Sequence, residues 1–294
     1  MEIDDVKLPL EAHGIVQQDE NGLLSVRYSK FQASTEGANT FFLVDDAKII
    51  THLIDDSPIE DIPTAWLKLH LLSLRFFKPN ELNLENIFSV LPNIAWTNKG
   101  PMRAESLENI VADDNLKVHA IDKFPPMTDY IIPKGVRIAD SSRVRLGAYL
   151  GEGTTIMHEG FVNYNAGTEG PNMIEGRISA GVFIGKDSDL GGGCSTMGTL
   201  SGGNKEVIKV GERCLLGANS GIGISLGNDC IVEAGLYLTA GTKVTMLEED
   251  KVVKALELSG KDGILYFRDS LSGKVCARPS KGSFKLNEVL HDNN

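Results

Sequence analysis

Aliphatic residues recur at every sixth position through the middle of the chain. The first run is unbroken from Ile132 to Val162, and the spacing resumes at Ile178. A six-residue period matches neither an amphipathic helix nor the alternation of a half-buried strand. It is typical of hexapeptide-repeat parallel β-helices, in which many short coils must stack before their apolar side chains are buried. The positions in step are Ile132, Ile138, Val144, Leu150, Ile156, Val162, Ile178, Ile184, Leu190, Ile208, Cys214, Leu226, Val232, Leu238 and Val244.

The repeat is interrupted between Val162 and Ile178, because the sixteen residues that separate them are not a multiple of six. We expect the irregularity at Ala166–Asn172, and a separate loop at Ser201–Glu206. Long loops of solenoid proteins commonly lie on the functional face, although a tolerated surface insertion explains the break equally well.

Three regions follow from this pattern. Residues 1–117 lack the repeat and are predicted to form a mixed α/β domain, residues 118–246 the β-helix, and residues 247–294 a cap that closes its open end. The predicted fold is therefore mainly β with a mixed α/β N-terminal domain. The expected elements are strands at Phe41–Val44 and Ile49–Ile54, helices at Pro63–Phe77 (capped by Asp61) and Asn83–Leu91, and a hairpin of Gly263–Arg268 with Lys274–Ala277.

Composition restricts the functional class. The chain is 41% hydrophobic and 23% charged, as folded proteins are, and its net charge of −11 argues against nucleic acid or an anionic membrane as the main partner. No apolar run is long enough to span a membrane, and the N-terminus does not have the pattern of a signal peptide. The four cysteines show no paired or metal-binding spacing. Together these features predict a cytoplasmic protein.

The charge is distributed unevenly. Residues 251–294 contain eight Lys and Arg against five Asp and Glu, which leaves this tail at +3 and the remainder at −14. A basic patch on an acidic protein suits an anionic small molecule, and a solvated surface is the alternative.

The candidate chemistry lies in the coils. Most left-handed parallel β-helices of this repeat type are trimeric acyltransferases that bind a coenzyme A thioester between subunits, although a fold does not by itself fix a function. His158 is a candidate general base, and Glu159 and Glu175 flank the break in the repeat. A partly desolvated carboxylate there would serve as base or nucleophile, whereas a surface glutamate in a polar turn is the alternative. A single histidine in the coils does not suit a three-histidine zinc site.

Several consecutive strings are similar to the tetrahydrodipicolinate N-succinyltransferase family, closest to its actinobacterial-type branch. The similarity is strong over roughly residues 130 to 290, and it covers the N-terminal domain only in size and position. The strings are Met157–Thr168, Ile174–Gly181, Asp189–Ser195, Cys214–Gly227 and Val232–Gly241.

The resemblance implies a left-handed β-helix enzyme that transfers the succinyl group of succinyl-CoA to tetrahydrodipicolinate, a step of diaminopimelate and lysine synthesis. It implies that Glu175 is the glutamate that forms an acyl anhydride, and that Lys254 and Arg268 face the phosphates of the coenzyme. The positions that match the thioester-binding residues are Arg177, Gly192, Ser195, Ala218, Glu233, Ala234 and Gly241.

The resemblance also implies a homotrimer in which Glu159 holds Mg²⁺ on the three-fold axis. Relatives that bind this ion have an acid near position 142, where this chain has Ser142, with Asp140 two residues earlier. The acceptor is a dicarboxylate, and the cationic or amide donors that suit it are Arg177, Asn163, Asn165 and Asn219.

Alternatives remain open at this point. Glu175 could act as a base in direct attack or as the nucleophile of a two-step path. The chain could instead be a hexapeptide acetyltransferase acting on an amino sugar, with His158 as its base. A non-catalytic scaffold is a third possibility, which the dense polar and glycine-rich strings argue against.

Overall fold

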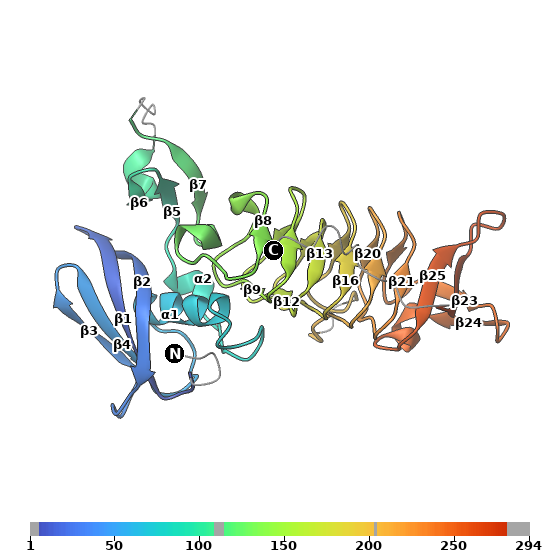
Figure 1. Ribbon diagram of the computed structural model, residues 1–294, viewed down its shortest axis with the longest axis horizontal. Helices are drawn as coiled ribbons and strands as arrows, with labels where there is room; N and C mark the ends of the chain where they lie inside the picture. The colour runs from blue at the N-terminus through green and yellow to red at the C-terminus, as the bar shows by residue number, and fades with distance from the viewer. Residues whose placement is uncertain (1–5, 109–114, 203–204, 281–294) are drawn as a thin grey trace. The chain divides into compact units, whose positions relative to one another are not determined.

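The computed structural model describes residues 6–108, 115–202 and 205–280, and the chain divides into two compact units, residues 1–131 and 132–294 (Figure 1). This boundary lies later than the predicted 117/118. The reason is that β7 (Val118–Asp122) pairs with β5 (Ile94–Thr97) in a small antiparallel sheet of the first unit.

The first unit contains a four-stranded antiparallel sheet in the order β2-β1-β4-β3. Helix α1 (Ile62–Ser73) packs against it, and Tyr28 of β2 donates a hydrogen bond of 3.0 Å to the carbonyl of Pro63. The predicted cap is confirmed, because the Asp61 carboxylate accepts from the amide of Thr64 at 2.7 Å. The helix ends at Ser73 rather than at Phe77. The strands are β1 (Leu10–Asp19), β2 (Gly22–Ala33), β3 (Thr40–Asp45) and β4 (Lys48–Leu53).

The rest of the first unit is short and irregular. The helix predicted over Asn83–Leu91 is reduced to the single turn α2 (Ile87–Val90). The small sheet has the order β6-β5-β7, with β6 at Gly100–Arg103, and 3₁₀ turns lie at Ala104–Leu107 and Met127–Asp129. Both tryptophans of the chain, Trp66 and Trp96, are buried here with their ring centroids 6.0 Å apart.

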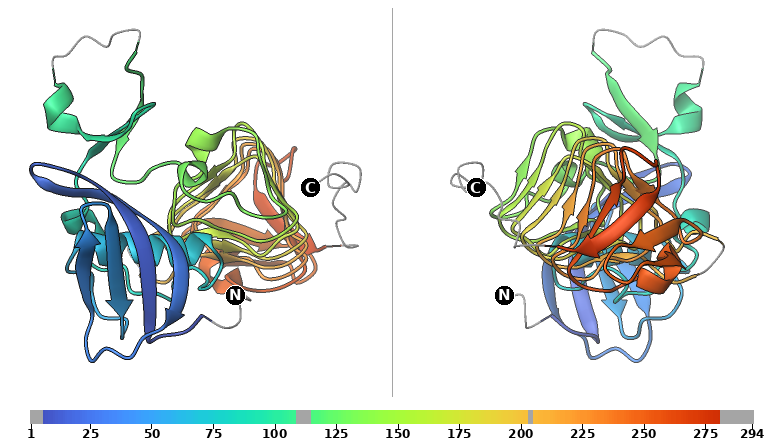
Figure 2. Two further views of the ribbon diagram at one scale, coloured as in Figure 1. Left: turned by 60° about the vertical axis from the view of Figure 1, so that its left-hand side comes forward. Right: turned by 90° about the vertical axis from the view of Figure 1, so that its right-hand side faces the viewer.

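The second unit is a left-handed parallel β-helix with three faces, as predicted, and Figure 2 shows its triangular cross-section. We call the faces A, B and C in the order in which each coil passes through them. Face A contains β8 (Arg137–Ile138), β10 (Thr154–Ile156), β13 (Asn172–Ile174), β16 (Ser188–Leu190), β19 (Leu215–Leu216) and β21 (Ile231–Val232). Face B contains β11 (Phe161–Val162), β14 (Arg177–Ile178), β17 (Ser195–Thr196), β20 (Gly221–Ile222) and β22 (Tyr237–Leu238). Face C contains β9 (Tyr149–Leu150), β12 (Gly167–Thr168), β15 (Phe183–Ile184) and β18 (Lys209–Val210).

The core of the prism is a set of stacked aliphatic columns. On face A, Ile156, Ile174, Leu190, Leu216 and Val232 lie in register from one coil to the next and are fully buried. Burial of each such side chain contributes roughly 1.5–3 kcal/mol, so the stack of coils is stable although each strand has only two or three residues.

The break in the repeat is a shortened corner, and it lies later than expected. Ile156 and Ile174 are eighteen residues apart and in register, whereas Ile174 and Leu190 are in register at sixteen. Only Glu175 and Gly176 connect β13 to β14, so the two missing residues belong to the corner between faces A and B. The prediction at Ala166–Asn172 was wrong, because this segment keeps the regular register with Thr168 at an inward position.

Two further irregularities follow along the chain. The described residues between β17 and β18 form an inserted loop with a bridge between Thr199 and Val207, and residues 203 and 204 of the predicted Ser201–Glu206 loop lie outside the described residues. A second shortened corner, residues 223–225, connects Ile222 on face B to Leu226, which pairs with Val210. Ile208 and Cys214 are therefore buried corner residues, and the inward strand positions are Val210 and Leu216.

The C-terminal residues cap the prism. After Met246 the parallel coils give way to antiparallel pairing of β23 (Lys243–Met246) with β24 (Lys251–Lys254). The predicted hairpin is confirmed as β25 (Ile264–Arg268) and β26 (Val275–Pro279), and β25 extends face A by pairing with β21. The basic residues Lys281 and Lys285 of the predicted tail lie outside the described residues. None of the helices described is long and apolar enough to cross a membrane.

Candidate active site

The corner between faces A and B carries most of the predicted site. Backbone hydrogen bonds of 2.8–2.9 Å connect its successive coils, from Asn219 to the carbonyl of Gly192 and from Gly235 to the carbonyl of Ala218. The corner therefore forms a continuous edge of the prism in which glycines and alanines keep the backbone accessible. The predicted residues on this edge are Glu159, Glu175, Gly192, Ala218, Glu233 and Ala234.

Two of the predicted carboxylates converge on one glycine. A Cβ atom at Gly192 would lie 3.5 Å from Oε2 of Glu175 and 3.6 Å from Oε2 of Glu159. Glu175 is half-buried and Glu159 is exposed. The structure thus brings these two acids, sixteen residues apart in sequence, to the same point of the edge.

Glycine is required where the corner is short. A Cβ atom at Gly176 would lie 2.7 Å from the backbone oxygen of Cys194 and closer still to its sulfur. Because the next coil passes so near, only glycine fits beside Glu175. The carbonyl of Leu190 accepts the amide of Glu175 at 2.7 Å, which fixes the backbone that carries this carboxylate.

A third acid, Asp189, joins this group, and the sequence analysis missed it. Asp189 lies in β16, half-buried, on the coil next to Glu175. Burial, followed by the charge of Glu175, raises the pKa of Asp189 to about 6. Burial and the nearby acids also raise the pKa of the Cys194 thiol to about 12, so this thiol stays neutral. The sequence signal was present, since Asp189 opens one of the family-like strings, but no role was given to it.

Of the cationic and amide side chains proposed to bind the acceptor, only some lie near the acids. Arg177 is exposed on face B and pairs in register with Ser195 of the next coil. Among the amides proposed for the acceptor, Asn219 lies on the edge itself, where its Oδ1 approaches Gly193. Asn163 and Asn165 lie at the other end of face B, and the Oδ1 of Asn163 accepts from Arg145 at 3.0 Å.

The remaining coenzyme-binding candidates form two small groups near the cap. Arg268 lies beside Glu233, since its amide donates to the Oε2 atom of Glu233 at 2.7 Å. Gly241 and Lys254 lie on neighbouring segments beyond face B, where the amide of Ala255 donates to the carbonyl of Thr242 at 2.8 Å. The predicted set therefore occupies the A/B edge, face B and the cap of the second unit.

The residues around Glu159 supply few metal ligands within one chain. Asp140 accepts hydrogen bonds from the amide and the hydroxyl of Ser142 at 2.9 and 2.7 Å, and these bonds lower its pKa. The described ranges contain no group of three or more His, Cys, Asp or Glu residues arranged to hold a metal ion.

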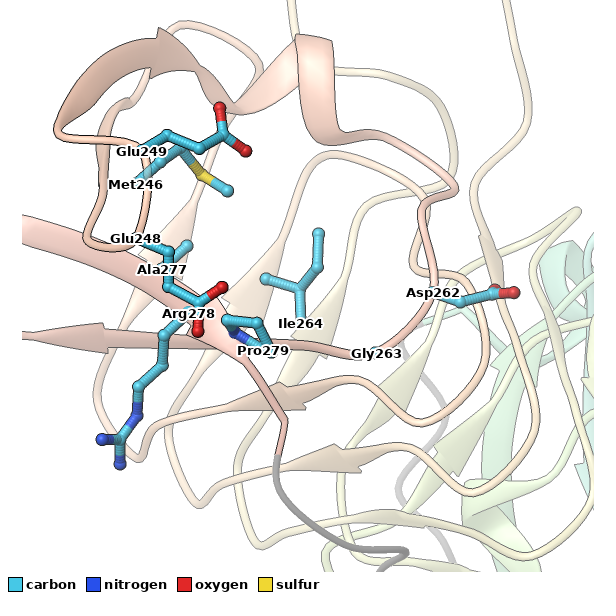
Figure 3. A pocket seen from close by; sticks show the side chains of 9 residues that line it. All are labelled: Met246, Glu248, Glu249, Asp262, Gly263, Ile264, Ala277, Arg278 and Pro279. Atoms are coloured by element: carbon cyan, nitrogen blue, oxygen red, sulfur yellow. The ribbon is translucent and has the colours of Figure 1, made fainter.

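A cavity of about 260 Å³ lies in the cap, apart from these residues (Figure 3). Its walls combine acidic and basic side chains, including Glu248, Glu249 and Arg278, with the apolar Ile264 and Met246. None of the predicted site residues lines it, so the candidate active site is the open edge rather than this hollow.

Comparisons with known proteins agree with the sequence strings. Residues 207–240 match the family model of the hexapeptide repeat of succinyl-transferase, and residues 91–125 match that of the tetrahydrodipicolinate N-succinyltransferase middle region. The chain is 59% identical, over 255 residues, to the 2,3,4,5-tetrahydropyridine-2,6-dicarboxylate N-succinyltransferases of Pseudomonas putida and Pseudomonas paraeruginosa. The aligned part covers 84% of this chain and 74% of each of those proteins.

A solved structure shares the architecture of the whole chain. It is a Campylobacter jejuni protein described as a 2,3,4,5-tetrahydropyridine-2-carboxylate N-succinyltransferase, 29% identical to this chain, with a TM-score of 0.86. The alignment covers 94% of both chains, so it includes the N-terminal unit as well as the β-helix.

Proposed function

Because the chain belongs to the 2,3,4,5-tetrahydropyridine-2,6-dicarboxylate N-succinyltransferase family, we propose that its A/B edge transfers the succinyl group of succinyl-CoA to tetrahydrodipicolinate. The reaction is a step of diaminopimelate and lysine synthesis. The observation that carries this function is the 59% identity over 84% of the chain. The relatives compared are from Pseudomonas, and assignment to the actinobacterial-type branch stays a prediction.

Glu175 is the proposed acyl carrier. Its carboxylate lies in the shortened corner, half-buried, on a backbone held by the next coil. Attack of one of its oxygens on the thioester carbonyl would form a mixed anhydride and release the coenzyme thiolate. Amide N–H groups of glycine-rich corners are suited to stabilise the negative oxygen that develops in this step.

The coenzyme is proposed to lie along the same edge toward the cap. The small residues Gly192, Ala218 and Ala234 leave room for an extended chain, and the exposed cations Lys254 and Arg268 suit its phosphates. Arg177 and Asn219 supply donors for the carboxylates of the acceptor. Phosphate and carboxylate groups bind such charge-assisted donors more strongly than neutral ones.

A homotrimer is proposed, with active sites between subunits and the protein in the cytoplasm. Three copies of Glu159 around a three-fold axis would supply the carboxylates that a single chain lacks, and Mg²⁺ prefers such oxygen ligands. Bound there, the ion would tie the subunits together. Light scattering at micromolar concentration tests the assembly, and a purely monomeric species would contradict it.

One assay tests the function. Thiol release is measured from succinyl-CoA and from acetyl-CoA, each with and without tetrahydrodipicolinate. We expect release that depends on both succinyl-CoA and the acceptor. Thiol release from acetyl-CoA that depends on an amino sugar would instead indicate the alternative acetyltransferase. If no thiol is released from either acyl-CoA, only the scaffold alternative is left.

A further inference from the structure

We propose that Asp189 is the general base of this acyl transfer and accepts the proton of the acceptor nitrogen while Glu175 carries the acyl group. The inference rests on the proposed function and adds to it a residue that the sequence strings did not single out. It divides nucleophile and base between two carboxylates of adjacent coils.

The placement of Asp189 is the first support. Asp189 pairs in register with Met173 of the preceding coil, two residues before Glu175, and Leu190 beside it accepts the amide of Glu175. The two acids therefore belong to neighbouring coils, with Asp189 on face A and Glu175 at the adjoining A/B corner, close enough for the charge of Glu175 to act on Asp189.

The second support is that this carboxylate is not used structurally. Within the described part of the chain, the side chain of Asp189 has no hydrogen bond or ion pair, although it is half-buried. A half-buried carboxylate without a partner loses part of its hydration on folding and gains no contact in return, so a functional reason for keeping it is expected.

The surroundings of Asp189 determine the pH above which its carboxyl group is charged. Its register neighbours Met173 and Leu215 are uncharged, Glu175 faces it with a like charge, and Cys194 is a neutral thiol whose own neighbours include Arg177. Burial and Glu175 raise the pKa of Asp189 to about 6, which suits a base that works near neutral pH.

The proton balance is simple. Water adds across the C=N bond of the acceptor, which makes its nitrogen an amine with a hydrogen to lose. This nitrogen attacks the acyl carbon of the anhydride, the C–N bond forms, the C–O bond to Glu175 breaks, and the electron pair returns to the Glu175 carboxylate. Asp189 takes the nitrogen's proton and later gives it to water, whereas the thiolate that left earlier takes a proton from water.

The test compares Asp189→Asn with Asp229→Asn, a matched acid near the other end of face A that is paired with Arg213. Loss of a general base typically costs about 10²–10⁴ in rate, so kcat of D189N is expected to fall by at least about 100-fold, with KM for succinyl-CoA nearly unchanged. The kcat/KM of the unaltered chain for the acceptor should rise with pH and level off above about 6, and D189N should lose this inflection. D229N should match the unaltered chain, and D189E should recover part of the rate.

Circular dichroism and light scattering establish whether each variant is folded and assembled. If D189N is not folded, the kcat and the pH profile of D189E are compared with those of the unaltered chain instead. A folded D189N that keeps kcat within about threefold and the same pH profile would overturn the inference, while the proposed function stands. Absence of acceptor-dependent thiol release from the unaltered chain would overturn the proposed function and this inference with it.

Discussion

Acidic side chains lie toward both ends of face A, and their surroundings shift their pKa values in opposite directions. At the C/A corner, Arg213 binds Asp229 at 2.7 and 3.0 Å and Glu212 at 2.7 Å, and its hydrogen bonds lower the pKa of Asp229. Toward the A/B corner, burial and the carboxylate of Glu175 at that corner raise the pKa of Asp189, in the middle of β16, instead. Paired acids of the first kind are a structural element, whereas unpaired acids of the second kind are typical of functional sites. An acidic residue of this prism therefore indicates a functional site only when it lacks an ion-pair or hydrogen-bond partner.

The largest expected effect is at Glu175. Glu175→Gln keeps the shape of the side chain but removes its charge and its reactive oxygen, so kcat should fall by about 10²–10⁴. Steady-state thiol release measures the change. Glu152→Gln, at an exposed glutamate of another corner, is the control and should be neutral. Full activity of E175Q would exclude Glu175 from the chemistry and return attention to His158 and Glu159.

Replacement of the cations near the cap tests whether the residues that bind the coenzyme are separate from the residues that carry out acyl transfer. Lys254 and Arg268 are both exposed, and contacts of exposed charges are individually weak. Replacement of both by Ala should raise KM for succinyl-CoA by about 5- to 30-fold with little change in kcat. The same replacement of Lys251 and Lys274 is the control, and an unchanged KM in the first variant would limit the tail to a capping role.

Stability should respond to Asp189 in the direction opposite to activity. Its pKa is about 6 in the folded chain against an ordinary value of 3.8, so ionisation costs folding free energy that appears as pH rises through this interval and is fully present above it. D189N should therefore be more stable at pH 8 by roughly 1–3 kcal/mol. The gain should shrink as the pH falls toward 4. Denaturant unfolding at several pH values measures this difference in unfolding free energy. A D189N variant that is less stable than the unaltered chain at pH 8 would contradict the conclusion that Asp189 has no partner.

The smallest effect is expected at the paired end. Asp229→Asn removes an acid whose pKa is lowered by Arg213, so the stability it contributes is present above its unfolded pKa and is lost as the pH falls through the lower, folded value. Because the pair is partly exposed, D229N should lower Tm only slightly at pH 7 and leave kcat unchanged. Loss of activity in D229N would remove the contrast between the two ends.

The six-residue spacing was sufficient to predict the β-helix, because one inward aliphatic residue per face is the physical requirement for stacking. Its irregularities were harder to place. Thr168 occupies an inward position, where its hydroxyl lies 2.8 Å from that of Thr154, and its polar side chain hid the continuing register. The break was therefore assigned too early, although Glu175 was correctly placed next to it.

A second misreading has a similar cause. Ile208 and Cys214 are apolar and six residues apart, yet they are buried at corners rather than on strands. Corners of this prism bury apolar side chains as the strands do, so hydrophobicity alone does not distinguish them. Asp189 was missed for another reason, since its proximity to Glu175 arises only when coils of unequal length stack.

Both tryptophans lie in the first unit, and the β-helix contains none. Indole emission is therefore an optical reporter of residues 1–131 alone, whereas far-ultraviolet dichroism is dominated by strands from both units. Denaturation followed by the two signals together separates loss of the N-terminal unit from loss of the coils that carry the carboxylates. Noncoincident curves would reveal a partly folded enzyme with its prism intact, and each variant above can be assigned to the unit that it weakens.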